Sequence, residues 1–288
     1  MTSRVLDRAR LFAELAVVVA ITSFVGALAY AFASDAADAD ALPAPASTDA
    51  AVVDGDGTPV AVDDGIDLDD GVAADPGADP TAVIAAAAEA MGAVTSVEFR
   101  LERDGAPVFI DQFESLALDG LVGQFTVPGR AQAQLRITVD DDLATEIGAI
   151  AVGEEIWISN PVTGDFETLP DGIDIDPSQF FDPDDGWRPL LSGLRDVELV
   201  GITERDGERY HLRGIAPASE VENITVGLVE DQDITIDVWV HPGTSLVTHV
   251  EFETDLGNGT SQWSLEMARY GASFTIRPPA NVRETSGS

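Results

Sequence analysis

The sequence predicts an α+β domain in which an N-terminal helix and a few short inserted helices cover a curved antiparallel sheet, a half-barrel. Apolar and polar residues alternate with a period of two in many segments of the second two-thirds of the chain, which is typical of strands with one buried and one solvated face. Helical patterns occur at the start of this region and in its middle, an order that favours α+β over βαβ.

The N-terminal part of the chain is expected to be a membrane segment. Residues 1–10 contain three arginines, and the apolar run 11–33 follows them. A run of this length spans a bilayer, and the preceding arginines place residues 1–10 in the cytoplasm. A cleaved signal peptide is the alternative, since Ala31-Phe32-Ala33 resembles a cleavage site. The remaining chain is therefore expected outside the cytoplasm, either attached to the cell membrane or secreted.

Residues 34–79 are expected to form a disordered acidic linker. They contain thirteen aspartates and no lysine, arginine or aromatic residue, so they cannot bury enough apolar surface to offset the loss of chain entropy. The folded domain is expected to span residues 80–288. It begins with a capping Asp79, Pro80 in the first turn and an alanine-rich helix that reaches Met91.

Five segments alternate clearly enough to assign an apolar face to a strand. These faces comprise Val97, Phe99 and Leu101; Leu135, Ile137 and Val139; Ile234, Ile236, Val238 and Val240; Leu246, Thr248, Val250 and Phe252; and Trp263, Leu265 and Met267. Short helices are predicted at residues 176–181, 184–194 and 219–223.

Composition and motifs exclude several classes of function. The chain has 52 acidic and 15 basic residues, for a net charge of −37, so no nucleic-acid partner is expected. The absence of cysteine excludes disulfides and thiolate metal sites. The sequence lacks nucleophile motifs, and His211, His241 and His249 lack metal-site spacing and are expected at the surface. We therefore predict no catalytic residue, no metal site and no cofactor.

The middle of the chain resembles the LppX/LprAFG lipoproteins, a family of mycobacterial-type lipid carriers. The residues that match the family signature are Asp176, Pro177, Ser178, Gln179, Pro183, Gly186, Leu190 and Leu191. Similar stretches follow in the same order at residues 210–221, 237–246 and 265–279. Family members carry an acylated cysteine near the N-terminus, which this chain lacks. The apolar run and the acidic linker would replace that anchor.

The resemblance implies a fold similar to periplasmic lipoprotein carriers, which hold acyl chains between a curved sheet and its helices. It implies binding of a lipid or glycolipid, a candidate envelope transporter as partner, and no catalysis. The residues expected to line the cavity from the sheet are Phe99, Leu101, Leu135, Ile137, Val139 and Ile156. Those expected to close it from the helices are Phe180, Trp187, Leu190 and Leu191.

Periodicity alone favours a simpler role for these helix residues, namely to plug the open face of the sheet, whereas the resemblance favours a movable lid. The alternative function is therefore an envelope structural or sensory module, in which the same fold has a collapsed core and binds a protein partner. A hydrolase that uses scattered carboxylates is a third hypothesis without motif support. Bound lipid would distinguish the carrier from the other two.

Overall fold

The computed structural model describes residues 65–109, 116–139, 143–153, 155–160, 163–168, 186–225, 229, 231–257 and 259–283. All of these belong to one of the two units into which the chain divides. The predicted membrane segment 11–33, the linker up to residue 64 and the expected helix 176–181 lie outside them. Among the described residues, no helix has the length and apolar character needed to cross a membrane.

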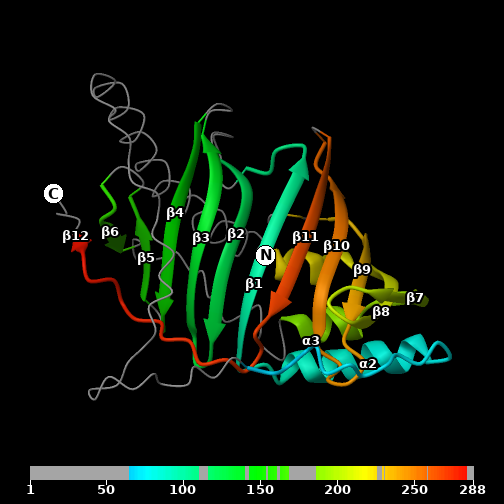
Figure 1. Ribbon diagram of the computed structural model, residues 1–288. Coiled ribbons are helices and arrows are strands. Elements are labelled where there is room, and N and C mark those ends of the chain that lie inside the picture. Colours follow the sequence, from blue (N-terminus) through cyan, green and yellow to red (C-terminus); the bar gives the residue numbers. More distant parts are fainter. Residues whose placement is uncertain are drawn as a thin grey trace, which may run out of the picture. The chain divides into compact units, whose positions relative to one another are not determined.

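The alternating segments form one open sheet of twelve strands (Figure 1). The strands are β1 (Ser96–Gly105), β2 (Leu116–Thr126), β3 (Arg130–Val139), β4 (Leu143–Val152), β5 (Glu155–Ser159), β6 (Phe166–Thr168), β7 (Arg195–Glu204), β8 (Glu208–Ala216), β9 (Ile234–Val240), β10 (Val247–Asp255), β11 (Thr260–Ala268) and β12 (Val282–Arg283). Their order in the sheet is β12-β6-β5-β4-β3-β2-β1-β11-β10-β9-β8-β7. All neighbours pair antiparallel except β12 and β6, which pair parallel.

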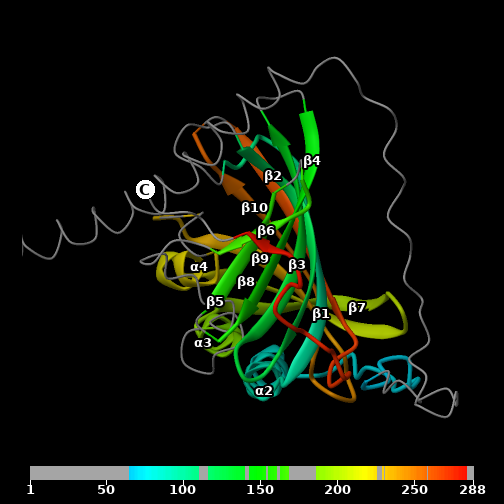
Figure 2. The same ribbon diagram turned by 90° about the vertical axis from the view of Figure 1, so that its left-hand side faces the viewer.

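Three described helices, α2 (Pro80–Gly92), α3 (Trp187–Ser192) and α4 (Ala218–Ile224), lie on the same side of this sheet (Figure 2). Helix α2 begins as the sequence predicts, because the Asp79 side chain accepts a hydrogen bond from the backbone N–H of Thr81 at 3.0 Å. Helix α3 falls within the expected segment 184–194, and helix α4 overlaps the expected segment 219–223. The predicted α+β class, with an antiparallel sheet and helices on one face, is confirmed.

The strand register gives each strand an inner face, which packs on the helices, and an outer face. The main core joins inner-face residues to the helices, and its members include Met91, Leu191, Phe125, Val238 and Tyr270. Tyr270 is fully buried and donates a hydrogen bond from its hydroxyl to the carbonyl oxygen of Val247. Burial raises the pKa of this phenol well above its usual value, so it stays a donor.

Residues 65–79, which we call the strap, fall within the expected linker but contact the sheet. The backbone N–H of Ile66 donates to the carbonyl oxygen of Tyr270 at 2.7 Å, and the carbonyl oxygen of Leu68 accepts from Nη2 of Arg209 at 2.9 Å. The backbone N–H of Asp75 donates to the Tyr210 hydroxyl at 3.0 Å. The folded unit therefore extends N-terminal to residue 80. Composition did not indicate this, because the strap is held by polar contacts to distant residues.

Candidate ligand-binding face

The inner face of β1 to β5 carries three adjacent cross-strand rows of apolar or small residues. The first row is Leu101, Leu121, Leu135 and Ile147; the second is Phe99, Gly123, Ala133, Ala149 and Ile158; and the third is Val97, Phe125, Ala131, Ala151 and Ile156. The third row lies beside the helices, and most of its side chains are buried in the main core. We call these three rows the apolar face.

The middle row has little side-chain volume, because Gly123, Ala133 and Ala149 occupy its centre. The Phe99 ring lies over Gly123, where a Cβ atom would come within 2.6 Å of Cζ of the ring. Ala133 and Ala149 stay half-buried, as do Phe99 and most members of the first row. A soluble domain rarely leaves contiguous apolar surface partly uncovered unless it binds something there.

The helix residues expected to close the cavity pack against one end of this face. Trp187, Leu190 and Leu191 are buried in the same core cluster as Met91 of α2. An ion pair between Nη2 of Arg188 and an oxygen of Glu89 at 2.9 Å also joins α3 to α2. These residues form part of the packed core, so their action as a movable lid stays a prediction. Phe180 lies outside the described residues.

The register brings the sheet residues expected at the cavity onto one side of the sheet. Phe99, Leu101, Leu135 and Ile156 are half-buried members of the apolar face, whereas Ile137 and Val139 are buried farther along β3. Sequence reasoning missed the contributions of β2 and β4, and single residues of β3 and β5; the missed residues are Leu121, Gly123, Ala133, Ile147, Ala149 and Ile158. In β4 the alanines and glycine weaken the alternation that would have indicated a face.

A bulge in β2 hides its contribution from the sequence. The pairing of β2 with β3 shifts between Leu118 and Gly120, so that Leu118 and Leu121 both lie on the inner face although they are three residues apart. Such a bulge adds one residue to a strand and inverts its alternation beyond that point. The period-two pattern of β2 therefore changes phase at Asp119.

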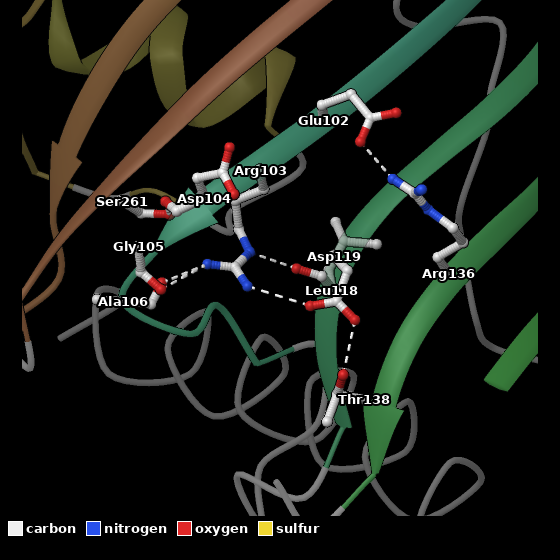
Figure 3. Close-up of polar contacts among 10 residues, drawn as sticks. All are labelled: Glu102, Arg103, Asp104, Gly105, Ala106, Leu118, Asp119, Arg136, Thr138 and Ser261. Carbon is white, nitrogen blue, oxygen red and sulfur yellow. Dashed lines mark hydrogen bonds and ion pairs between the residues drawn. The ribbon is translucent and has the colours of Figure 1, made fainter. Parts of the chain in front are cut away.

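A buried arginine holds this bulge in place (Figure 3). Arg103 is only 7% exposed; its Nη2 lies 3.2 Å from Oδ1 of Asp119, and its Nε donates to the carbonyl oxygen of Leu118. Its Nη1 donates to the carbonyl oxygen of Ala106 at 2.6 Å, and the Thr138 hydroxyl donates to Oδ2 of Asp119 at 2.7 Å. This set of contacts fixes the turn after β1 to the bulge, so its role is structural.

The outer face of the sheet differs in character. It has a cleft of about 720 Å³, lined by polar groups that alternate in sequence with inner-face residues. The lining carboxylates are Glu102, Asp104, Asp233, Asp237, Glu251 and Glu253. Most of them are already paired: Asp237, for example, accepts hydrogen bonds from both His211 and Arg213. Such a surface does not suit acyl chains.

The histidines are less exposed than the sequence predicted. His211 and His249 lie on the outer face, as expected, and flank Trp239, but His249 and His241 are buried. Burial lowers the pKa of both buried imidazoles, although hydrogen bonds to Glu251 and Asp70 act to raise it. The expected surface position is therefore wrong for His241 and His249: Asp70 of the strap lies 3.3 Å from Nε2 of His241, and the Trp239 ring packs against the ring of His249. The described residues contain no cluster of histidine, aspartate or glutamate suited to a metal ion.

Comparison with known proteins agrees with this geometry. The family model described as LppX_LprAFG lipoprotein matches residues 79–276. The structure of LprF from Mycobacterium bovis is similar, with a TM-score of 0.58 and 16% identity over 72% of this chain and 100% of that chain. Lipoprotein LppX from Mycobacterium tuberculosis gives a TM-score of 0.49 and 18% identity, over 69% of this chain and 98% of that chain. No curated protein matches the chain in sequence.

Proposed function

Because the chain belongs to the LppX_LprAFG lipoprotein family, we propose that it binds the acyl chains of a lipid or glycolipid against its apolar face. It would carry or present that lipid on the extracytoplasmic side of the membrane. The observation that supports this most is the half-buried state of Leu121, Leu135 and their neighbours. These side chains are apolar, contiguous and on the face that the helices cover elsewhere.

The apolar face has suitable chemistry for acyl chains. Each CH₂ group that leaves water contributes about 0.8 kcal/mol, so a dozen buried groups contribute about 10 kcal/mol. The small side chains of Ala133 and Ala149, which are half-buried, leave depth for a chain to lie along the sheet beside the Phe99 ring that covers Gly123. Phe99 and Leu101 would contact it from β1. No bond of the lipid needs to change, and the proposed role is therefore not catalytic.

We propose that the apolar segment 11–33 retains the protein at the cell membrane, in place of the acylated cysteine of the family. In the cleaved case the same domain would be secreted. Mass spectrometry of the mature N-terminus distinguishes the two, since cleavage after Ala33 removes the whole apolar run.

The lipid-binding proposal is tested by extraction and native mass spectrometry of the purified full chain. We expect co-purified lipid in the wild type and much less in the Ala133→Trp variant, because the indole occupies the space over the middle row. The matched control is Gln134→Trp, one residue along β3 on the outer face, which should keep the lipid. Wild-type protein without lipid would favour the envelope module with a collapsed core, and equal lipid in both variants would place the ligand elsewhere.

A further inference from the structure

One end of the sheet brings together four chain segments that are far apart in sequence. We call it the basal rim, and it comprises Gly65 and Ile66, the β2–β3 turn at residues 127–129, the turn at Gly153, and residues 270–277. Backbone hydrogen bonds link these segments: Ile66 to Tyr270 at 2.7 Å, Gly271 to Ser96 at 3.0 Å, Val127 to Thr95 at 2.9 Å and Gly153 to Gly129 at 2.9 Å. Figure 1 shows the segment after β11 running beneath the lower ends of the strands.

The basal rim exposes apolar side chains. Val127 is 48% exposed and Ile66 is 45% exposed, which are among the highest values for large apolar residues in the described chain. Pro128, next to Val127 in the turn, is exposed as well. These residues lie on the loops at the end of the sheet, so they can meet a flat surface without any rearrangement of the strands.

The basal rim also carries two arginines that form no ion pair with any carboxylate in the described part of the chain. Arg130 and Arg277 are both exposed, and Nη1 of Arg130 donates to the carbonyl oxygen of Ile276 at 3.2 Å, so the two are neighbours. Nine of the twelve arginines in the described part of the chain form ion pairs with carboxylates there, and the remaining one, Arg209, is buried. In a chain with 52 acidic residues, two adjacent unpaired cations are an uncommon feature.

We propose that the basal rim is a membrane-contact surface, in which Ile66 and Val127 enter the lipid interface and the two arginines bind anionic lipid phosphates. Arginine suits phosphate because its planar guanidinium can donate two parallel hydrogen bonds. The rest of the acidic surface is repelled by such a bilayer, so the rim is the part that can approach. Glu155 lies two strands from Arg130, since both residues pair with Val152, and its carboxylate would weaken the attraction of the rim for an anionic bilayer.

The position of the preceding chain supports a lipid surface as the partner. Residues 34–64 connect the predicted membrane segment directly to Gly65, which is itself part of the rim. Only 31 residues separate Gly65 from that segment, so the domain stays close to the bilayer and the rim has a high effective concentration there. The inference therefore rests on the proposed membrane segment. It adds the orientation of the domain, with the basal rim toward the membrane.

The test uses the full chain in vesicles made of equal parts phosphatidylcholine and phosphatidylglycerol with brominated acyl chains. The protein has no cysteine, so a single introduced cysteine carries a fluorescent label whose quenching reports lipid contact. We expect strong quenching for Val127→Cys. The matched control is Leu143→Cys, another exposed apolar residue, at the opposite end of the sheet because Leu143 pairs with the last residue of β3. It should be quenched weakly.

Replacing Arg130 and Arg277 by glutamine should lower the lipid-bound population at position 127 by about fivefold per arginine, whereas the ion-paired Arg136→Gln leaves it unchanged. Equal quenching at positions 127 and 143, no quenching at either, or a chain that fails to float with the vesicles would overturn the inference. Contact at position 127 that depends on protein concentration and not on lipid would assign the rim to a second copy, and would also overturn it. Lipid extraction tests the apolar face separately, so either idea can fail alone.

Discussion

Replacing Gly123 by alanine should destabilise the domain, because the new Cβ atom would overlap the Phe99 ring and the backbone of Gln132. The new Cβ would lie 2.6 Å from Cζ and 2.9 Å from Cε2 of Phe99, and 3.0 Å from the carbonyl oxygen of Gln132. Carbon atoms at such distances overlap, so the ring or the strand must move. Overpacking of this kind costs about 1–3 kcal/mol. For a domain of this size that corresponds to a fall in Tm of roughly 2–4 °C per kcal/mol.

The assay is urea or thermal unfolding of a double-mutant cycle with Phe99→Leu, which removes the ring but keeps an apolar side chain. The double variant should lose less stability than the sum of the single variants, by about 0.5–3 kcal/mol. Rescue should be partial, since the contact with Gln132 remains. Gly148→Ala on the outer face is the control, because its Cβ meets only Ser159 and Phe166 side-chain atoms, at 3.2 Å or more. Strictly additive losses, or a Gly123→Ala variant as stable as the wild type, would refute the position of the Phe99 ring over Gly123.

Three further outcomes are expected. A chain that starts at Pro80 should unfold at a lower temperature than one that starts at Gly65, because loss of the strap leaves buried polar groups of β8 and the following turns unpaired; equal Tm values would contradict this. Burial holds the pKa of His249 below its usual value, so the unfolded state binds the proton first; this contribution to stability is complete above about pH 6.5 and decreases as pH falls through the window below it. The His249→Gln variant should accordingly show a shallower loss of stability on acidification than the wild type, measured by urea unfolding at several pH values. Asp119→Ala should lower the free energy of unfolding by about 1–3 kcal/mol, because it leaves Arg103 buried without its carboxylate. An unchanged urea midpoint would argue against a stabilising role of Arg103 and Asp119 at the β2 bulge.

Local sequence patterns were sufficient to predict the class of the fold and the inner face of several strands. Period-two alternation is enforced by burial, because a polar residue on an inner face loses its hydration unless, like Arg103 of β1, it gains partners there. The same reasoning placed Phe99, Leu101 and Leu135 on the inner face of the sheet. The start of α2 was predictable too, because Asp79 and Pro80 act on their immediate neighbours. Each of these features depends on local sequence alone.

Features that join distant segments of the chain could be found only in the folded structure. The β2 bulge, the partners of Arg103 and the burial of His241 depend on residues that the sequence places far away. The glycine and alanines of the middle row have no periodic signal, since a small side chain can be assigned to a face of the sheet only when its cross-strand neighbours are known. The strap resembles the linker in composition, and only its hydrogen bonds to the sheet distinguish it. The hydrophobic pattern of a strand depends on residues that are neighbours in sequence. The hydrogen-bond partners of buried polar groups and the packing of side chains depend on residues that are distant in sequence.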